Sequence, residues 1–141
     1  LVGGGRNHRM GLHDQVLIKD NHLVVLNAAG SDVFDIIEGL DREELPKVEI
    51  EVTSVEDAVK ALKAGVDIIM LDNMDVESIR EAVHAVSEAA AGLNLPVPEL
   101  EASGGVSLET VAAVADTGVH RISVGALTHS ARGVDISLEV V

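Results

Sequence analysis

Residues 47–73 read KVEIEVTSVEDAVKALKAGVDIIMLDN, and this stretch decides how we expect the chain to fold. It opens with a run of β-branched and acidic residues over 47–52, and it closes with a predicted strand over 67–71, in which Asp67 is followed by four apolar residues, typical of a fully buried strand. Between them, a capping-box pattern at 53–56 precedes apolar residues at helical spacing, and Gly65 ends the predicted helix. A strand, a helix and a strand in succession predict two parallel strands.

The same alternation continues on both sides of this unit. We predict further strands over 15–19, 99–102 and 121–124, a short helix over 33–40 and a loop over 92–98 that contains two prolines. Two more helices are expected, each with an apolar face. The first is capped by Asp75 and buries Val76, Ile79, Val83 and Val86; the second runs from a cap at Ser107 to Gly118 and buries Leu108, Val111, Ala112 and Ala115.

Repeated strand–helix units indicate an α/β fold, either an open doubly wound sheet or a TIM-like (β/α) barrel. A full barrel takes about 250 residues, so five strands in 141 residues predict part of one, with its first strands before Leu1. We treat residues 1–141 as a single domain. In either architecture, ligands bind at the carboxyl ends of the strands.

The composition excludes several classes of protein. The net charge is −14, from 24 acidic and 10 basic residues, which argues against nucleic-acid binding. There is no cysteine for disulfides or thiolate zinc sites, and no apolar run is long enough to span a membrane. Such acidity is typical of a halophilic source and equally of an ordinary acidic cytosolic protein.

Cations gather near the beginning of this acidic chain. Three of the ten Lys and Arg residues and three of the six histidines fall within residues 6–22. Among them, His8, Arg9 and Lys19 offer hydrogen-bond donors to a carboxylate or a phosphate. Lys19 ends an apolar strand, where an unpaired charge would be costly to bury. We therefore expect a small ligand with several negative groups, rather than a solvated loop with incidental cations.

Two carboxylates stand at the ends of neighbouring predicted strands. Glu51 and Asp72 are suited to hold Mg²⁺ or the hydroxyl groups of a sugar, and a structural ion pair with Lys19 or Arg9 is an equal alternative. Glu49 lies on the same face of its strand as Glu51, so the pattern leaves open which of the two faces the site.

Glycine-rich turns follow the last two predicted strands. Ser103, Gly104 and Gly105 precede a helix, and Gly125 with Ala126 follows the next strand. Backbone N–H groups at such turns bind phosphate, and paired loops after late strands form the phosphate site of many barrels. The residues at 3–5 are also glycines, but their spacing does not match a dinucleotide-binding motif, and the histidine spacing does not match a zinc hydrolase.

Taken together, the motifs resemble the quinolinate phosphoribosyltransferase family, also called carboxylating nicotinate-nucleotide pyrophosphorylase. The motifs that carry the resemblance occur in order over the whole chain: GGGRNHRMGL (3–12), LIKDNH (17–22), EIEV (49–52), IMLDNM (69–74), EASGGV (101–106), TGV (117–119), SVGALTHS (123–130) and DISL (135–138).

The resemblance implies a reaction, a cofactor and site residues. Quinolinate and 5-phosphoribosyl-1-pyrophosphate would give nicotinate mononucleotide, pyrophosphate and CO₂, with Mg²⁺, in the cytoplasm and in a homo-oligomer (a dimer or a hexamer). His8, Arg9 and Lys19 match the pocket for quinolinate and pyrophosphate, and the resemblance selects Glu51, with Asp72, for the ribose and metal side. The ribose 5-phosphate would lie on the backbone cradle matched by Ser103, Gly104, Gly105, Gly125 and Ala126.

The resemblance also implies that parts of the family pattern lie outside the sequence. The amino-terminal α/β domain, which completes the site of a neighbouring subunit, and an earlier Thr-Arg-Lys-type motif are not among residues 1–141. We therefore expect the carboxyl-terminal half of the barrel, inactive by itself. Two alternatives stay open: a paralogue of the same fold associated with molybdenum transport, and a non-catalytic phosphate-binding fragment. The intact run at 19–22 favours the phosphoribosyltransferase.

Overall fold

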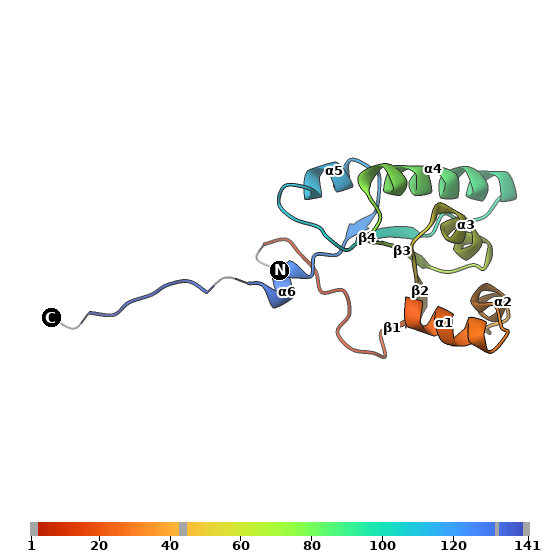
Figure 1. Ribbon diagram of the computed structural model, residues 1–141, viewed down its shortest axis with the longest axis horizontal. Helices are drawn as coiled ribbons and strands as arrows, with labels where there is room; N and C mark the ends of the chain where they lie inside the picture. Colours follow the sequence, from red (N-terminus) through yellow and green to blue (C-terminus); the bar gives the residue numbers. More distant parts are fainter. Residues whose placement is uncertain (1–2, 43–44, 132, 140–141) are drawn as a thin grey trace.

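In the computed structural model, which describes residues 3–42, 45–131 and 133–139, five parallel strands form one sheet in the order β1-β2-β3-β4-β5 (Figure 1). The strands are β1 (Gln15–Ile18), β2 (Lys47–Val52), β3 (Ile68–Asp72), β4 (Glu99–Ser103) and β5 (Arg121–Ile122). The helices are α1 (Asp20–Ala28), α2 (Val33–Glu38), α3 (Val55–Lys63), α4 (Val76–Leu93), α5 (Val111–Ala115) and α6 (Ala126–His129).

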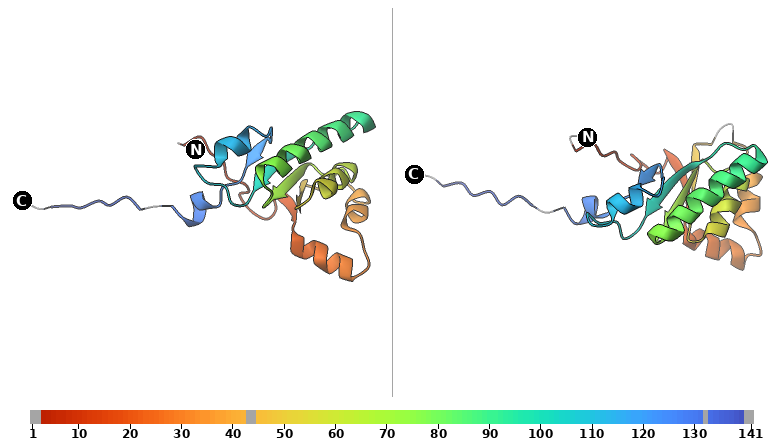
Figure 2. Two further views of the ribbon diagram at one scale, coloured as in Figure 1. Left: turned by 45° about the horizontal axis from the view of Figure 1, so that its top comes forward. Right: turned by 90° about the horizontal axis from the view of Figure 1, so that it is seen from above.

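The sheet has two different faces. Helices α1 to α5 line one face, whereas the segment before β1 runs toward the other (Figures 1 and 2). Alternate strand residues that point to the helices form the hydrophobic core, among them Val48, Ile50, Ile69, Leu71 and Leu100. The opposite face, called the inner face below, carries Glu49, Glu51 and Glu101, and all three are buried.

This arrangement decides between the two predicted architectures. The strands follow one another in chain order, with no reversal of the kind that defines a doubly wound sheet. Successive crossovers of one hand place all the helices on the same side of the sheet. A curled sheet covered by helices on one side only is a segment of a (β/α) barrel, so the barrel interpretation is confirmed.

The helix inside the 47–73 stretch begins one residue later than the capping-box prediction. Ser54, not Thr53, is the N-cap of α3, and its Oγ accepts a hydrogen bond from the backbone N–H of Asp57 at 3.1 Å. The hydroxyl in turn donates to the Asp57 carboxylate at 2.8 Å. Asp57 therefore takes the place expected for Glu56, because a short acidic side chain at the third helical position also reaches the cap.

Helix α4 agrees with its prediction. Asp75 is the N-cap and accepts a hydrogen bond from the Ser78 backbone N–H at 2.8 Å. Ile79 and Val86 are buried against the sheet as predicted, and Val76 and Val83 are half-buried. The helix runs to Leu93, two residues into the predicted loop, and ends on Asn94 in the left-handed conformation, φ +55°.

The last predicted helix differs more. Helix α5 begins at Val111, because residues 108–110 form a turn held by Ser107, whose Oγ accepts from the Glu109 N–H at 3.2 Å. The predicted inward face is wrong: Leu108 is 92% exposed, and Val114 is the helical residue that is buried. Strand β5 also ends two residues earlier than predicted, and α1 and α6 were not predicted from the sequence.

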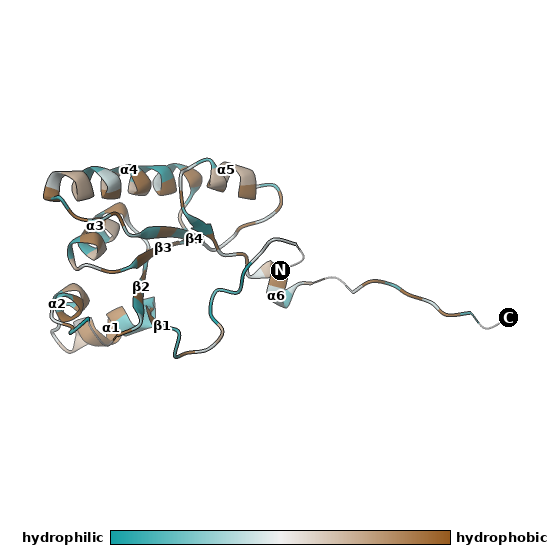
Figure 3. Cartoon of the chain, turned by 180° about the vertical axis from the view of Figure 1, so that it is seen from behind, coloured by the Kyte–Doolittle hydropathy of each residue, from teal (hydrophilic) through white to brown (hydrophobic). Residues whose placement is uncertain are grey.

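The chain after α6 runs away from the sheet. This segment carries hydrophobic residues along its length (Figure 3), and Val134, Ile136 and Leu138 are all exposed. Among the described residues, no helix combines the length and the apolar character needed to cross a membrane.

Candidate functional site

An open cleft with a volume of about 1640 Å³ lies over β4, β5 and the loops that follow them. Its walls include His8 and Arg9, which the segment before β1 contributes, and the polar inner-face residues of β4 and β5. All five residues of the two predicted phosphate-binding turns also line it: Ser103, Gly104, Gly105, Gly125 and Ala126. The structure therefore brings seven predicted site residues to one cavity.

The turn after β4 needs glycine for two physical reasons. Gly104 and Gly105 have positive φ angles of 88° and 63°, which residues with a side chain rarely adopt. A Cβ at Gly104 would also collide with the side chain of Asn73, the residue that follows β3. Asn73 itself donates its backbone N–H to the Ser103 carbonyl at 2.9 Å, so the two strand ends are fixed together. The glycines leave the backbone of this turn open to the cleft.

The turn after β5 brings a histidine to the same cleft. Gly125 opens α6, and a Cβ placed there would lie 3.2 Å from Nε2 of His129. His129 lines the cleft, and its Nδ1 lies 2.7 Å from the Ser130 hydroxyl. This histidine adds a polar side chain beside the two glycine turns.

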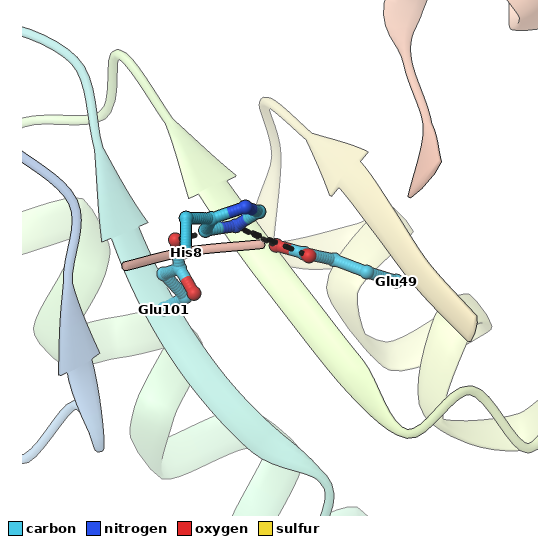
Figure 4. Close-up of side chains that lie close together, drawn as sticks. All are labelled: His8, Glu49 and Glu101. Atoms are coloured by element: carbon cyan, nitrogen blue, oxygen red, sulfur yellow. Dashed lines mark hydrogen bonds and ion pairs between the residues drawn. The ribbon is translucent and has the colours of Figure 1, made fainter. Parts of the chain in front are cut away.

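His8 lies between two buried carboxylates from different strands (Figure 4). Its Nε2 is 3.3 Å from Oε2 of Glu49 on β2 and 3.2 Å from Oε1 of Glu101 on β4. The side chains of Glu49 and Glu101 are 0% and 1% exposed, whereas 30% of the His8 side chain is exposed. These three residues are called the His8 cluster below; His8 and Glu101 line the cleft, and Glu49 is buried beside them.

Glu49 and Glu101 also have partners other than His8. Gln15 on β1 donates its side-chain N–H to Glu49, and the Ser123 hydroxyl donates to Glu101 at 2.5 Å. The Arg121 guanidinium lies 4.0 Å from Glu101. Burial first, and then the charge of Glu101, raise the pKa of Glu49, although His8 and Arg121 oppose this rise.

Lys19 and Glu51 meet away from the cleft. The Lys19 ammonium lies 3.1 Å from Oε2 of Glu51; Lys19 follows β1, and Glu51 is the last residue but one of β2. This contact agrees with the ion-pair alternative of the sequence analysis. The expectation that Lys19 would share one wall with His8 and Arg9 is not met, since Lys19, Glu51 and Asp72 are not among the residues that line the cleft. The reason is that Lys19 and Glu51 lie at the carboxyl ends of β1 and β2, and β3 separates these two strands from β4 and β5.

Asp72 connects the two regions. It ends β3, where it is the direct neighbour of Ser103 on β4, and it accepts a hydrogen bond from the Asn73 side chain at 2.5 Å. The predicted convergence of strand ends therefore holds for neighbouring strands, while the sheet as a whole spreads its polar ends over a wide arc.

Glu51 and Asp72 have the donor chemistry that Mg²⁺ prefers. Both offer carboxylate oxygens at adjacent strand ends, and Oε2 of Glu51 is buried with Lys19 as an ion-pair partner but with no hydrogen bond of good geometry. These residues fit a magnesium ion. The ion would take the place of Lys19 in neutralising the buried negative charge of Glu51.

Sequence reasoning missed several residues that line the cleft. Glu101 and Arg121 lie on the inner face of β4 and β5, Ser123 directly follows β5, and His129 ends α6. The alternation of side chains along a strand was a usable signal for two of them. Glu101 shares the face of Ser103, two residues later, and Arg121 shares the face of Ser123. No local pattern indicated the role of Glu49 beside His8.

Comparisons with known proteins agree on one family. The family described as "Quinolinate phosphoribosyl transferase, C-terminal domain" matches residues 1–139. The chain is 39% identical over 156 residues to quinolinate phosphoribosyltransferase [decarboxylating] 2b, mitochondrial, of Nicotiana tabacum, covering 99% of this chain and 42% of that protein. It is 40% identical over 139 residues to a probable nicotinate-nucleotide pyrophosphorylase [carboxylating] of Methanothermobacter thermautotrophicus, covering 99% of this chain and 48% of that protein. The chain thus spans about half the length of these relatives.

Solved structures give the same result. NadC from Streptococcus pyogenes superposes with a TM-score of 0.74 at 37% identity, over 99% of this chain and 45% of that one. The nicotinate-nucleotide pyrophosphorylase of Ehrlichia chaffeensis superposes with a TM-score of 0.73 at 35% identity, over 92% of this chain and 43% of that one. On its motifs, its parallel barrel segment and these matches, the chain belongs to the quinolinate phosphoribosyl transferase C-terminal domain family.

Proposed function

We propose that the full-length protein, meaning the whole natural polypeptide in which residues 1–141 occur, transfers a phosphoribosyl group to quinolinate. The substrates are quinolinate and 5-phosphoribosyl-1-pyrophosphate, and the products are nicotinate mononucleotide, pyrophosphate and CO₂, a step of NAD biosynthesis. The observation that carries this proposal is the single cleft in which His8 and Arg9 face two glycine turns, in a chain of this family. Cations for a dicarboxylate and backbone donors for a phosphate are the two recognition elements that the reaction requires.

Arg9 and His8 are proposed to bind the carboxylates of quinolinate. Arg9 is half-buried in the cleft wall, and a guanidinium grips a carboxylate through two parallel hydrogen bonds. His8 adds a second donor, and its carboxylate partners hold the ring in place. Together they would hold the pyridine ring of quinolinate at a fixed distance from the ribose.

The glycine turns are proposed to bind the 5-phosphate of the ribose. The turns at Ser103–Gly105 and Gly125–Ala126 offer backbone N–H groups as donors. Their glycines have no Cβ, so a phosphate can approach these N–H groups closely. Such contacts hold the sugar without adding a flexible cation.

Lys19, Glu51 and Asp72 are proposed to act on the ribose and the leaving group. Asp72 ends the strand next to Ser103, so a ribose held by its phosphate would extend toward Asp72 and Glu51. Both carboxylates would accept hydrogen bonds from the ribose hydroxyls, and Lys19 would pair with pyrophosphate oxygens. When bound at Glu51 and Asp72, Mg²⁺ would supply positive charge to the pyrophosphate.

The chemistry needs positioning and charge rather than a protein nucleophile. The bond from the ribose C1 to pyrophosphate breaks as the quinolinate ring nitrogen forms a bond to the same carbon. The carboxyl group beside that nitrogen then leaves as CO₂, and a proton takes its place on the ring carbon. Carboxylates near the sugar stabilise the positive charge that develops there, and cations stabilise the departing pyrophosphate.

A direct assay tests this function. The full-length protein is mixed with quinolinate, 5-phosphoribosyl-1-pyrophosphate and MgCl₂, and nicotinate mononucleotide and CO₂ are measured. We expect both products in equal amounts, and activity that is lost when MgCl₂ is omitted and chelator is added. A full-length protein that binds phosphate but makes no nicotinate mononucleotide would point instead to the paralogue or to the non-catalytic alternative.

The state of assembly and the location in the cell are part of the same proposal. We propose a homo-oligomer, a dimer or a hexamer, and a cytoplasmic enzyme, although the Nicotiana tabacum relative is named as mitochondrial. Light scattering on the full-length protein checks the mass, and cell fractionation checks the location.

A further inference from the structure

Two buried glutamates of the His8 cluster have no part in the proposed chemistry. Glu49 and Glu101 come from strands β2 and β4, on either side of β3, and both point to the same histidine nitrogen. Burying two carboxylates is costly unless they have partners that use their charge. Placing them under a cleft proposed to hold an anion adds repulsion. Their position therefore calls for a physical reason.

The geometry of His8 supplies one. Its Nε2 lies 3.3 Å from Glu49 and 3.2 Å from Glu101, so Nε2–H is the donor toward the protein. Among the described residues, Nδ1 of His8 has no hydrogen-bond partner, and the ring lines the cleft. In an imidazole the two nitrogens face different directions. Occupying Nε2 with the carboxylates therefore leaves Nδ1 for a ligand.

We propose that Glu49 and Glu101 are positioning residues that hold His8 by Nε2 and direct its Nδ1–H toward a carboxylate of the substrate. This inference rests on the proposed function, because the ligand that His8 meets is taken to be the dicarboxylate. Gln15 and Ser123 hold the two glutamates in turn, so the ring is fixed from three strands and from the stretch after β5. The pairing resembles the way in which a carboxylate fixes the ring of a histidine in metal sites and catalytic triads.

Charge supports the same arrangement. A histidine that donates from both nitrogens is an imidazolium, and its positive charge offsets the negative charge of the neighbouring carboxylates. His8 faces Glu49 from β2 and Glu101 from β4. Arg121 from β5 approaches Glu101, and the carboxylate of Glu99 is paired to Arg121. The glutamates thus act on the substrate through His8 and not by direct contact.

The test uses the full-length protein and the variants Glu101→Gln and Glu49→Gln. Each keeps the size of the side chain and removes its charge. We expect the KM for quinolinate to rise at least tenfold, and the KM for 5-phosphoribosyl-1-pyrophosphate to change less than twofold. Glu81→Gln, on the exposed face of α4, is the control and should leave both values unchanged.

A double-mutant cycle separates positioning from a general structural role. In a His8→Ala background, Glu101→Gln should cause no further rise in the KM for quinolinate, because its effect passes through the ring. Nitrogen NMR of His8 should show Nδ1 responding to quinolinate in the parent protein and the response weakening in Glu101→Gln. An equal effect of Glu101→Gln with and without His8 overturns the proposal, as does an unchanged KM in both glutamate variants.

Two controls keep the outcomes distinct. Thermal unfolding shows whether a variant folds, and Glu49→Gln serves if Glu101→Gln does not. If the parent protein makes no nicotinate mononucleotide, the proposed function fails; if it does and the variants match it, only this inference fails. A calorimetric titration with ZnCl₂ tests whether the His8 cluster binds a metal ion instead. Tight binding of one ion that Glu101→Gln abolishes would make the cluster a metal site and overturn the positioning role.

Discussion

At the scale of single residues, the site depends on which partner each charge meets. Lys19 meets Glu51 on β2, whereas His8 meets Glu49 on the same strand and Glu101 on β4, across β3. Glu49 and Glu51 lie on one face of β2, two residues apart, and yet they serve different neighbours. The sequence pattern left open which of the two glutamates faces the site. In the structure both have a charged or polar partner: Glu51 lies beside Lys19, and Glu49 lies beside His8.

Arg9 offers the sharpest binding prediction. In the full-length protein, Arg9→Ala should weaken quinolinate binding by roughly 2–5 kcal/mol, the usual effect of removing a hydrogen-bonded charge from a desolvated pair. Lys60→Ala, on the exposed side of α3, should leave binding unchanged. Calorimetric titration measures both, and equal effects of the two substitutions would remove Arg9 from the pocket.

The raised pKa of Glu49 predicts a pH dependence of stability. Burial and the nearby Glu101 charge raise it, so the folded protein keeps a proton that the unfolded chain releases. The stability contribution of this group is present below its ordinary pKa of 4.5 and is lost as pH rises through its raised value.

Glu49→Gln removes this titration. Between pH 4.5 and 7 the free energy of unfolding of the variant should fall less steeply with pH, by up to about 1.4 kcal/mol per pH unit. Urea unfolding at several pH values measures the slope, with Glu81→Gln as the exposed control. Parallel slopes in the parent and in Glu49→Gln would contradict the assignment.

At the scale of elements, local sequence rules worked where a helix is long and packs on the sheet. Strand β2 has the predicted bounds, and α4 begins at its predicted cap. The rules failed at α5, where Leu108 is exposed and the helix begins after a turn. That helix has five residues, so too few turns exist for periodicity to define a face.

The N-cap of α4 gives a stability prediction. Asp75 accepts a hydrogen bond from the Ser78 backbone N–H, and this contact lowers the pKa of Asp75. Asp75→Ala should destabilise the fold, because the N-cap hydrogen bond of α4 is lost. Denaturant unfolding at pH 7 measures the loss, and Glu81→Ala on the same helix should show none of it. A loss confined to Glu81→Ala would contradict the role of the cap.

At the scale of the whole molecule, five strands form an arc whose two ends carry different parts of the site. Lys19 and Glu51 lie toward β1, and the cleft lies over β4 and β5. The relatives are about twice as long as this chain. In a closed barrel the two ends of such an arc face each other across the lumen, which would bring the two groups of residues toward one ligand.

This geometry predicts that residues 1–141 alone have negligible turnover of quinolinate. The separated polypeptide holds the cleft and the Lys19–Glu51 pair on opposite ends of the sheet, without the elements that would close the barrel. Product formation by the separated chain and by the full-length protein, compared at equal concentration, measures the difference. Turnover at the full-length rate would show that the arc alone is a sufficient site.

The sequence by itself determined the order of the strands and of the helices α2 to α5, the parallel pairing, the family and seven of the residues that line the cleft. These properties depend on apolar periodicity, caps and turn residues, each of which acts over a few neighbouring positions. The tertiary structure confirmed the barrel segment, and it alone decided that Lys19 pairs with Glu51 and that His8 lies between two buried glutamates. His8 and Glu49 are 41 residues apart. Such a contact depends on the path of the chain across the sheet, and no local pattern encodes that path.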